Sequence, residues 1–235
     1  MSIPFFLAIS AQEFPFLSEL PSNIAWMSVH FSSYGSGLSN LPHNLPKGSL
    51  LILDDQTPWE GHSTEVVCRE IVESLLENQA TGLLLDFERP ATPETNLLTT
   101  ALSQCCREIG VMLGAPLSYA TDDAAIFISP LPCQTPPERL YQKNRKVWLD
   151  VSPGAYLIHI GAQGATGQAA DQRSFPDGTY PVFTDAELCC SYRSRPNAGG
   201  VDILLNHSRE SIETMLATLD ENAVQLAIGL YREFR

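Results

Sequence analysis

Short apolar runs alternate with amphipathic segments along the whole chain. The runs are continuous rather than strictly alternating, which is typical of strands in a parallel sheet that is covered on its outer face. We expect eight such strands, at residues 3–9, 24–30, 50–54, 82–87, 111–117, 125–129, 147–151 and 201–205.

The helices between these strands are predicted from their end signals. Thr92-Pro93-Glu94 has an N-cap residue, a proline at the first helical position and an acid in the first turn, and Gly110 is a stop signal. Further helix starts are predicted at residues 63, 135–138, 184–187 and 208, and residues 221–234 are predicted to form the last helix.

Eight strands with intervening helices in 235 residues predict an α/β fold, a single (β/α)8 TIM-type barrel domain spanning residues 1–235. We expect it to be compact and without an insertion domain. An open flavodoxin-like parallel sheet is the competing fold. The Gly/Ala/Gln-rich residues 161–178 are predicted to form a long loop.

Charge and composition narrow the functional classes. The chain carries 27 acidic and 14 basic residues, a formal charge of −13, which argues against nucleic-acid binding. No apolar run approaches the ~20 residues that span a bilayer, so no membrane partner is expected. The apolar N-terminus lacks a preceding basic region and is interpreted as a buried strand. The six cysteines show no C-x-x-C spacing, so we expect reduced thiols in a cytoplasmic protein. The oligomeric state is left open.

In a barrel the active site forms at the carboxyl ends of the strands, so polar residues there are the candidates. They are Gln12, His30, Asp54, Asp55, Asp86, Glu88, Tyr119, Asp150 and Asn206. An acidic rim of this kind suits glycoside hydrolysis or divalent-metal binding.

The fourth predicted strand carries the sharpest signal. Side chains alternate along a strand, so Leu84, Asp86 and Glu88 share one face. If the other face meets helices, both carboxylates point into the barrel and their titrations are coupled. One of them then holds a proton near neutral pH, as a general acid requires. The alternative is a structural role for both residues, in which Glu88 is a solvated loop acid and Asp86 caps a turn.

This strand resembles the signature strand of glycoside hydrolase family 18, the chitinase and endo-N-acetylglucosaminidase family, which reads D-G-x-D-x-D-x-E. Gly82, Asp86 and Glu88 match, whereas Thr81 and Leu84 stand where the family has aspartates. Residues 146–156 resemble the family's seventh strand and residues 199–203 its eighth.

The resemblance implies a glycoside hydrolase that acts on N-acetylated amino-sugar glycans by substrate-assisted retaining hydrolysis, without a cofactor. Glu88 would protonate the glycosidic oxygen, Asp86 would orient the acetamido group, and Tyr119 could hold the acetamido oxygen. The sixth strand lacks the family's Tyr-Asp pair, and the region of Leu205 and Asn206 replaces the tryptophan of the eighth. A catalytically inactive carbohydrate-binding barrel is therefore the second hypothesis.

Two further hypotheses concern the rim. Trp59 could stack on a sugar ring while Asp54 and Asp55 bind hydroxyls, or the indole could be partly buried in a turn. His30, Asp54 and Asp86 come from three adjacent strands, so a metal-dependent hydrolase is the third functional hypothesis, although we expect no resident metal. The glycine-rich residues 161–168 lack the lysine of a P-loop.

Overall fold

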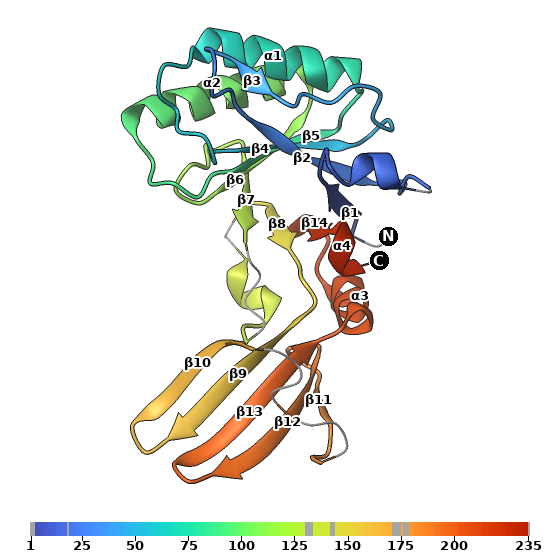
Figure 1. Ribbon diagram of the computed structural model, residues 1–235, viewed down its shortest axis with the longest axis vertical. Helices are drawn as coiled ribbons and strands as arrows, with labels where there is room; N and C mark the ends of the chain where they lie inside the picture. Colours follow the sequence, from blue (N-terminus) through green and yellow to red (C-terminus); the bar gives the residue numbers. More distant parts are fainter. Residues whose placement is uncertain are drawn as a thin grey trace.

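The computed structural model describes residues 3–17, 19–129, 134–141, 144–170, 175 and 179–234. Its main feature is a closed barrel of eight parallel strands (Figure 1). In chain order they are β1 (Phe5–Ile9), β2 (Ile24–Phe31), β4 (Leu50–Asp54), β5 (Gly82–Asp86), β6 (Met112–Pro116), β7 (Ala125–Ile128), β8 (Val147–Asp150) and β14 (Val224–Leu230). Because β1 pairs with both β14 and β2, the sheet closes, and the open flavodoxin-like alternative is wrong. A two-residue strand, β3 (Leu38–Ser39), adds to β2 in antiparallel orientation.

The two faces of each barrel strand have different neighbours. Leu51 and Leu83 point outward into the cluster that also contains residues of α1 (Thr64–Glu77) and α2 (Pro93–Ile109). Leu50 and Leu84 point inward, where Trp148 fills the centre of the barrel. A side chain at Gly114 would collide with the Trp148 ring, so the missing Cβ makes room for it.

The helix ends follow the predicted signals where the helices are long. The hydroxyl of Thr92 accepts a hydrogen bond from the N–H of Thr95, and Gly110 ends α2 with φ of 71°. α3 (Arg209–Thr218) begins after Ser208 as expected. The signal at 135–138 leads only to the short 3₁₀ turn η2 (Pro137–Leu140), and another 3₁₀ turn, η1 (Phe14–Phe16), lies between β1 and β2.

The prediction for the eighth strand is wrong. Residues 201–205 do not enter the barrel, and the strand that closes it is β14, inside the segment predicted to be a helix. Only its last residues, α4 (Tyr231–Phe234), are helical. Leu226 and Ile228 point into the barrel, and long-range pairing with β1 and β8 overrides the local pattern.

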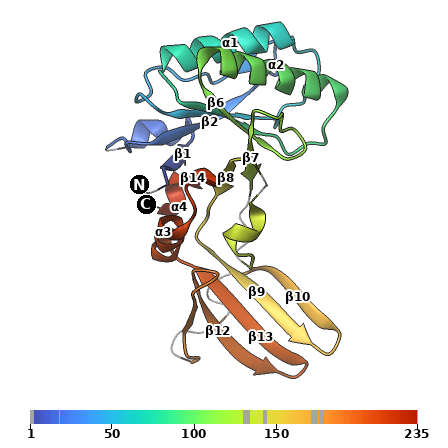
Figure 2. The ribbon, with the colours of Figure 1, turned by 180° about the vertical axis from the view of Figure 1, so that it is seen from behind.

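The expectation of a barrel without an insertion is also wrong. A five-stranded antiparallel sheet lies between β8 and α3 in the chain. Its strands are β9 (Gly154–Gly161), β10 (Gly164–Ala170), β11 (Phe183–Asp185), β12 (Cys190–Asn197) and β13 (Gly200–His207). Figures 1 and 2 show this sheet on the opposite side of the barrel from α1 and α2.

Pairing between strands overrides two local predictions. Residues 164–170 form β10 instead of part of a long loop, because they pair with β9 along their whole length. The remainder of that predicted loop lies largely outside the described residues. The capping-box pattern at 184–187 occurs at the end of β11 and in the turn after it, not in a helix. None of the helices in the described ranges combines the length and the apolar character needed to cross a bilayer.

Candidate functional site

Three neighbouring strands bring polar side chains to the carboxyl end of the barrel. His30 on β2 is in register with Asp54 on β4, and Asp54 is in register with Asp86 on β5. Asp54 and Asp86 follow the inward-facing Ile52 and Leu84 by two residues, so both carboxylates point inward. The predicted orientation of Asp86 is therefore confirmed.

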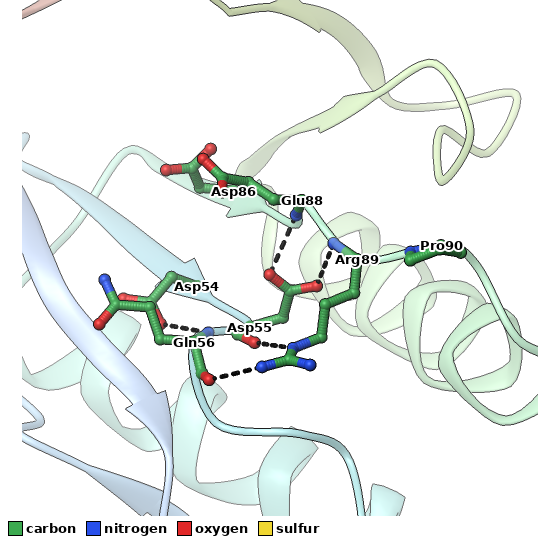
Figure 3. A pocket seen from close by; sticks show the side chains of 7 residues that line it. All are labelled: Asp54, Asp55, Gln56, Asp86, Glu88, Arg89 and Pro90. Carbon is green, nitrogen blue, oxygen red and sulfur yellow. Dashed lines mark hydrogen bonds between the residues drawn. The ribbon is translucent and has the colours of Figure 1, made fainter.

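Asp54 and Asp86, but not His30, line a pocket of about 410 Å³ at the mouth of the barrel. Its lining residues are Asp54, Asp55, Gln56, Asp86, Glu88, Arg89 and Pro90 (Figure 3). Glu88 is exposed and lies two residues beyond the end of β5, whereas Asp86 is half-buried and is the last residue of the strand. A ligand that filled this pocket would cover both acids and exclude water from them.

Burial and negative neighbours favour a protonated Asp86. Burial is the largest cause and the charges of Asp150, Glu88, Asp54 and Asp55 add to it, which raises the pKa of Asp86 from 3.8 to about 6. Burial also raises the pKa of Asp54, although the N–H of Gln56 and the nearby His30 oppose the shift. Asp86 can therefore carry a proton close to neutral pH.

Asp150 reaches the same interior from the other side of the barrel. It ends β8, three strands away from β5 in the closed order. Its carboxylate accepts a hydrogen bond of 2.6 Å from the hydroxyl of Ser129, and burial raises its pKa. Asp150 is the strongest of the charges acting on Asp86, although nothing in the local sequence connects the two.

Asp55 holds the two acidic loops together. Its carboxylate accepts hydrogen bonds from the N–H groups of Glu88 (3.0 Å) and Arg89 (2.9 Å). The Arg89 guanidinium donates to the carbonyls of Asp55 (2.7 Å) and Gln56 (2.9 Å), as Figure 3 shows. Asp55 is 8% exposed, and its hydrogen bonds fix the backbone of Glu88 and Arg89, which follow the end of β5. Asp55 is therefore a positioning residue. Arg89, its partner, is not among the candidates that the sequence indicates.

Replacing Asp55 by Ala should therefore lower the free energy of unfolding by about 2 kcal/mol, because two N–H groups lose a charged acceptor. Chemical denaturation measures this effect. Asp122→Ala, at an exposed position, is the matched control and should stay within about 0.5 kcal/mol of the native protein. Equal stability of the two variants would contradict the role of Asp55.

Tyr119 and Trp59 line a different pocket. It has a volume of about 370 Å³ and shares Asp55, Arg89 and Pro90 with the acidic pocket. Tyr119 is 4% exposed, and its hydroxyl donates a hydrogen bond of 2.8 Å to the Arg89 carbonyl, so it does not line the pocket of Asp86 and Glu88. Trp59 packs edge-on against Phe31, with ring centroids 5.1 Å apart.

Gln12 and Asn206 are not brought to the acidic pocket. Gln12 is exposed in the turn after β1. Asn206 lies on β13 of the antiparallel sheet, opposite Ala155 and Ser191, so its assignment to the end of a barrel strand is wrong. Across the described ranges, no group of three or more His, Cys, Asp or Glu side chains is arranged to hold a metal ion, and this includes the predicted set His30, Asp54 and Asp86.

The closed barrel and the antiparallel sheet after its seventh strand define a class of fold. It is the fold of glycoside hydrolase family 18, as the comparison with solved structures shows. No protein-family model and no curated protein matches the chain.

Three solved structures illustrate the likeness. A mutant family 18 chitinase from Cycas revoluta in complex with (GlcNAc)4 superposes with a TM-score of 0.56 at 10% identity, covering 96% of this chain and 94% of the chitinase. The spore cortex-lytic enzyme SleL of Bacillus megaterium gives 0.55 at 10% identity, with 99% and 71% covered. A chitinase from Chromobacterium violaceum gives 0.51 at 12% identity, with 98% and 94% covered.

Proposed function

We propose that this protein is a glycoside hydrolase that cleaves glycans containing N-acetylated amino sugars. The observation that carries the proposal is the pair Asp86, at the end of β5, and Glu88, two residues later, which line one pocket at the mouth of the barrel. Structures of the same fold were solved with N-acetylglucosamine oligomers or with allosamidin bound, which supports this substrate class.

The proposed reaction uses the acetamido group of the substrate as the nucleophile. Its carbonyl oxygen attacks the anomeric carbon while Glu88 gives its proton to the departing glycosidic oxygen. Asp86 accepts a hydrogen bond from the acetamido N–H and stabilises the positive charge that develops on the cyclic intermediate. Glu88 then takes a proton from the water that opens this intermediate, so the configuration at the anomeric carbon is retained.

Asp150 provides a partner that the signature strand lacks. Leu84, 1% exposed, stands below Asp86 where the family signature has an aspartate, and it cannot share a proton. Asp150, at the end of β8 and hydrogen-bonded to Ser129, instead contributes a negative charge that raises the pKa of Asp86. We propose that the charge of Asp150 keeps Asp86 partly protonated in the free protein. Asp150 would thereby replace the electrostatic effect of the aspartate that the family signature has at the position of Leu84.

Replacing Asp150 by Asn removes the strongest of the charges that oppose ionisation of Asp86. The pKa of Asp86 should fall, so the acidic limb of the pH profile of kcat/KM should move to lower pH. Hydrolysis rates measured across the acidic range test this. Glu73→Gln, at an exposed position on α1, is the control and should leave the profile unchanged. An unshifted profile for Asp150→Asn would contradict the coupling.

A carbohydrate-binding barrel without catalysis is the second candidate function. It is favoured by Tyr119, whose hydroxyl is bonded to the Arg89 carbonyl and does not line the acidic pocket. Incubation with chitooligosaccharides separates the candidates: shorter products seen by mass spectrometry support the hydrolase. Binding in calorimetry with no product over long incubation would exclude the hydrolase in favour of the binding protein.

A further inference from the structure

One face of the antiparallel sheet is apolar and partly exposed. Strand alternation and register place Tyr156, Ile158 and Ile160 of β9 on the same face as Leu205, Ile203 and Val201 of β13. Ala165, Gly167 and Ala169 of β10 continue the three cross-strand rows. We call these nine residues the uncharged face. Ile160 is 45% exposed and Val201 39% exposed, in a chain with a formal charge of −13.

The opposite face of the sheet is covered in part. Arg195 and Asp202 lie on that side, where the Arg195 guanidinium carbon is 4.5 Å from the ring centroid of Phe175. Phe175 is 1% exposed and Asp202 7% exposed. The side of the sheet with Arg195 and Asp202 is therefore partly covered, whereas the uncharged face, apart from the buried Leu205, is at least partly open to solvent although it is apolar.

One edge of this sheet is also unprotected. In the part of the chain that the structure describes, β10 pairs with β9 alone, and its residues are exposed apart from the half-buried Ala170. Its sequence, GATGQAA, has no proline and no charge, the usual devices that prevent a bare edge from pairing. The other edge strand, β11, has only three residues and ends in Asp185.

The pairing of β10 with β9 determines which backbone groups point outward. A two-residue turn joins Gly161 to Gly164, so the pair Gly161 and Gly164 is hydrogen-bonded. Hydrogen-bonded and non-hydrogen-bonded pairs then alternate along the two strands, and the pairs that contain Ala165, Gly167 and Ala169 are not hydrogen-bonded. The N–H and C=O groups of Ala165, Gly167 and Ala169 therefore face away from β9, available to another strand.

We propose that β10 pairs with β10 of a second copy of this chain, antiparallel about a two-fold axis at Gly167, to form a continuous ten-stranded sheet. This register places Ala165 of one copy opposite Ala169 of the other, and Thr166 opposite Gln168. Small residues thus meet small residues on the uncharged face, and polar residues meet on the opposite face.

Two features favour a second copy as the occupant. The two uncharged faces become one apolar surface across the axis, with no charge buried. A Cβ at Gly167 would lie 2.5 Å from the Tyr156 ring, so Tyr156 leans over β10 and would reach its counterpart across the axis. The interface is small, so we expect a dimer with a micromolar dissociation constant. Binding should become tighter as the salt concentration rises, because salt screens the repulsion between two negatively charged chains.

Sedimentation velocity from about 1 to 100 µM protein tests the proposal. The 25.8 kDa chain should shift from monomer to dimer over this range. The double variants Ala165→Lys with Ala169→Lys, and Ala165→Glu with Ala169→Glu, place like charges opposite each other and should remain monomeric. An equimolar mixture of the two variants should recover a heterodimer, because lysine then faces glutamate.

The matched control is Leu76→Lys with Leu97→Lys, which changes the charge equally at exposed positions on α1 and α2 and should still dimerise. Circular dichroism checks that each variant is folded. A native protein that stays monomeric at about 100 µM overturns the proposal. So do like-charge variants that still dimerise, a mixture that does not recover the heterodimer, and open-ended filaments instead of a closed dimer.

Discussion

Glu88→Gln is expected to lower kcat for chitooligosaccharide cleavage by about a thousandfold, because glutamine cannot give a proton to the departing oxygen. Glutamine keeps the size and much of the hydrogen-bonding capacity of the side chain, so the dissociation constant for the oligosaccharide should change by less than about threefold. Glu88 is exposed in the free protein, so the substitution should leave thermal stability unchanged.

The matched control for this variant is Glu60→Gln. Glu60 is an exposed acid that lines the neighbouring pocket of Trp59 and not the acidic pocket, so the control should retain most of the activity. A Glu88→Gln protein that hydrolyses the substrate at the native rate would remove Glu88 from the mechanism. A large rise in the dissociation constant with kcat unchanged would assign it to binding instead.

Asp86→Asn should abolish activity and at the same time stabilise the protein above pH 6. Burial and four neighbouring acids raise the pKa of Asp86 from 3.8 to about 6. The folded state thus binds a proton that the unfolded state releases, and the native protein loses stability as the pH rises from about 4 through 6. The neutral amide avoids this loss, so at pH 8 the variant should unfold with a free energy about 2 kcal/mol higher than that of the native protein.

Chemical denaturation at pH 4 and at pH 8 measures this difference. At pH 4 the native protein and Asp86→Asn should differ little, because Asp86 is protonated in the folded state. Asp122→Asn, at an exposed position, should show no pH-dependent gain. If Asp86→Asn is no more stable than the native protein at pH 8, the raised pKa of Asp86 is refuted, whatever the variant does to activity.

Most of the barrel could be predicted from local pattern. The first seven strands lie where the apolar runs place them, because a strand buried on both sides needs apolar residues at every position. The helix that begins at Thr92 and ends at Gly110 also follows its signals. The eighth strand could not be found in this way, since residues 201–205 have the same apolar character as β14 and only pairing partners distinguish them.

The candidate site was predictable only in part. Asp86 points inward as alternation requires, and Glu88 lines the same pocket. The role of Asp55 was not predictable, because its partners Glu88 and Arg89 lie 33 and 34 residues along the chain. Tyr119 was assigned to the acetamido group by resemblance, but its hydroxyl is bonded to the Arg89 carbonyl outside the acidic pocket.

The sequence by itself determined the period of the strands and therefore that Asp86 shares the inward face of Leu84, because alternation is a property of the extended backbone alone. Only the tertiary structure decided which strand closes the barrel and that the charge of Asp150 acts on Asp86. It also decided that an antiparallel sheet with one bare edge follows β8. These features depend on contacts between residues far apart in the chain, and the free energy of such contacts is not contained in any local stretch.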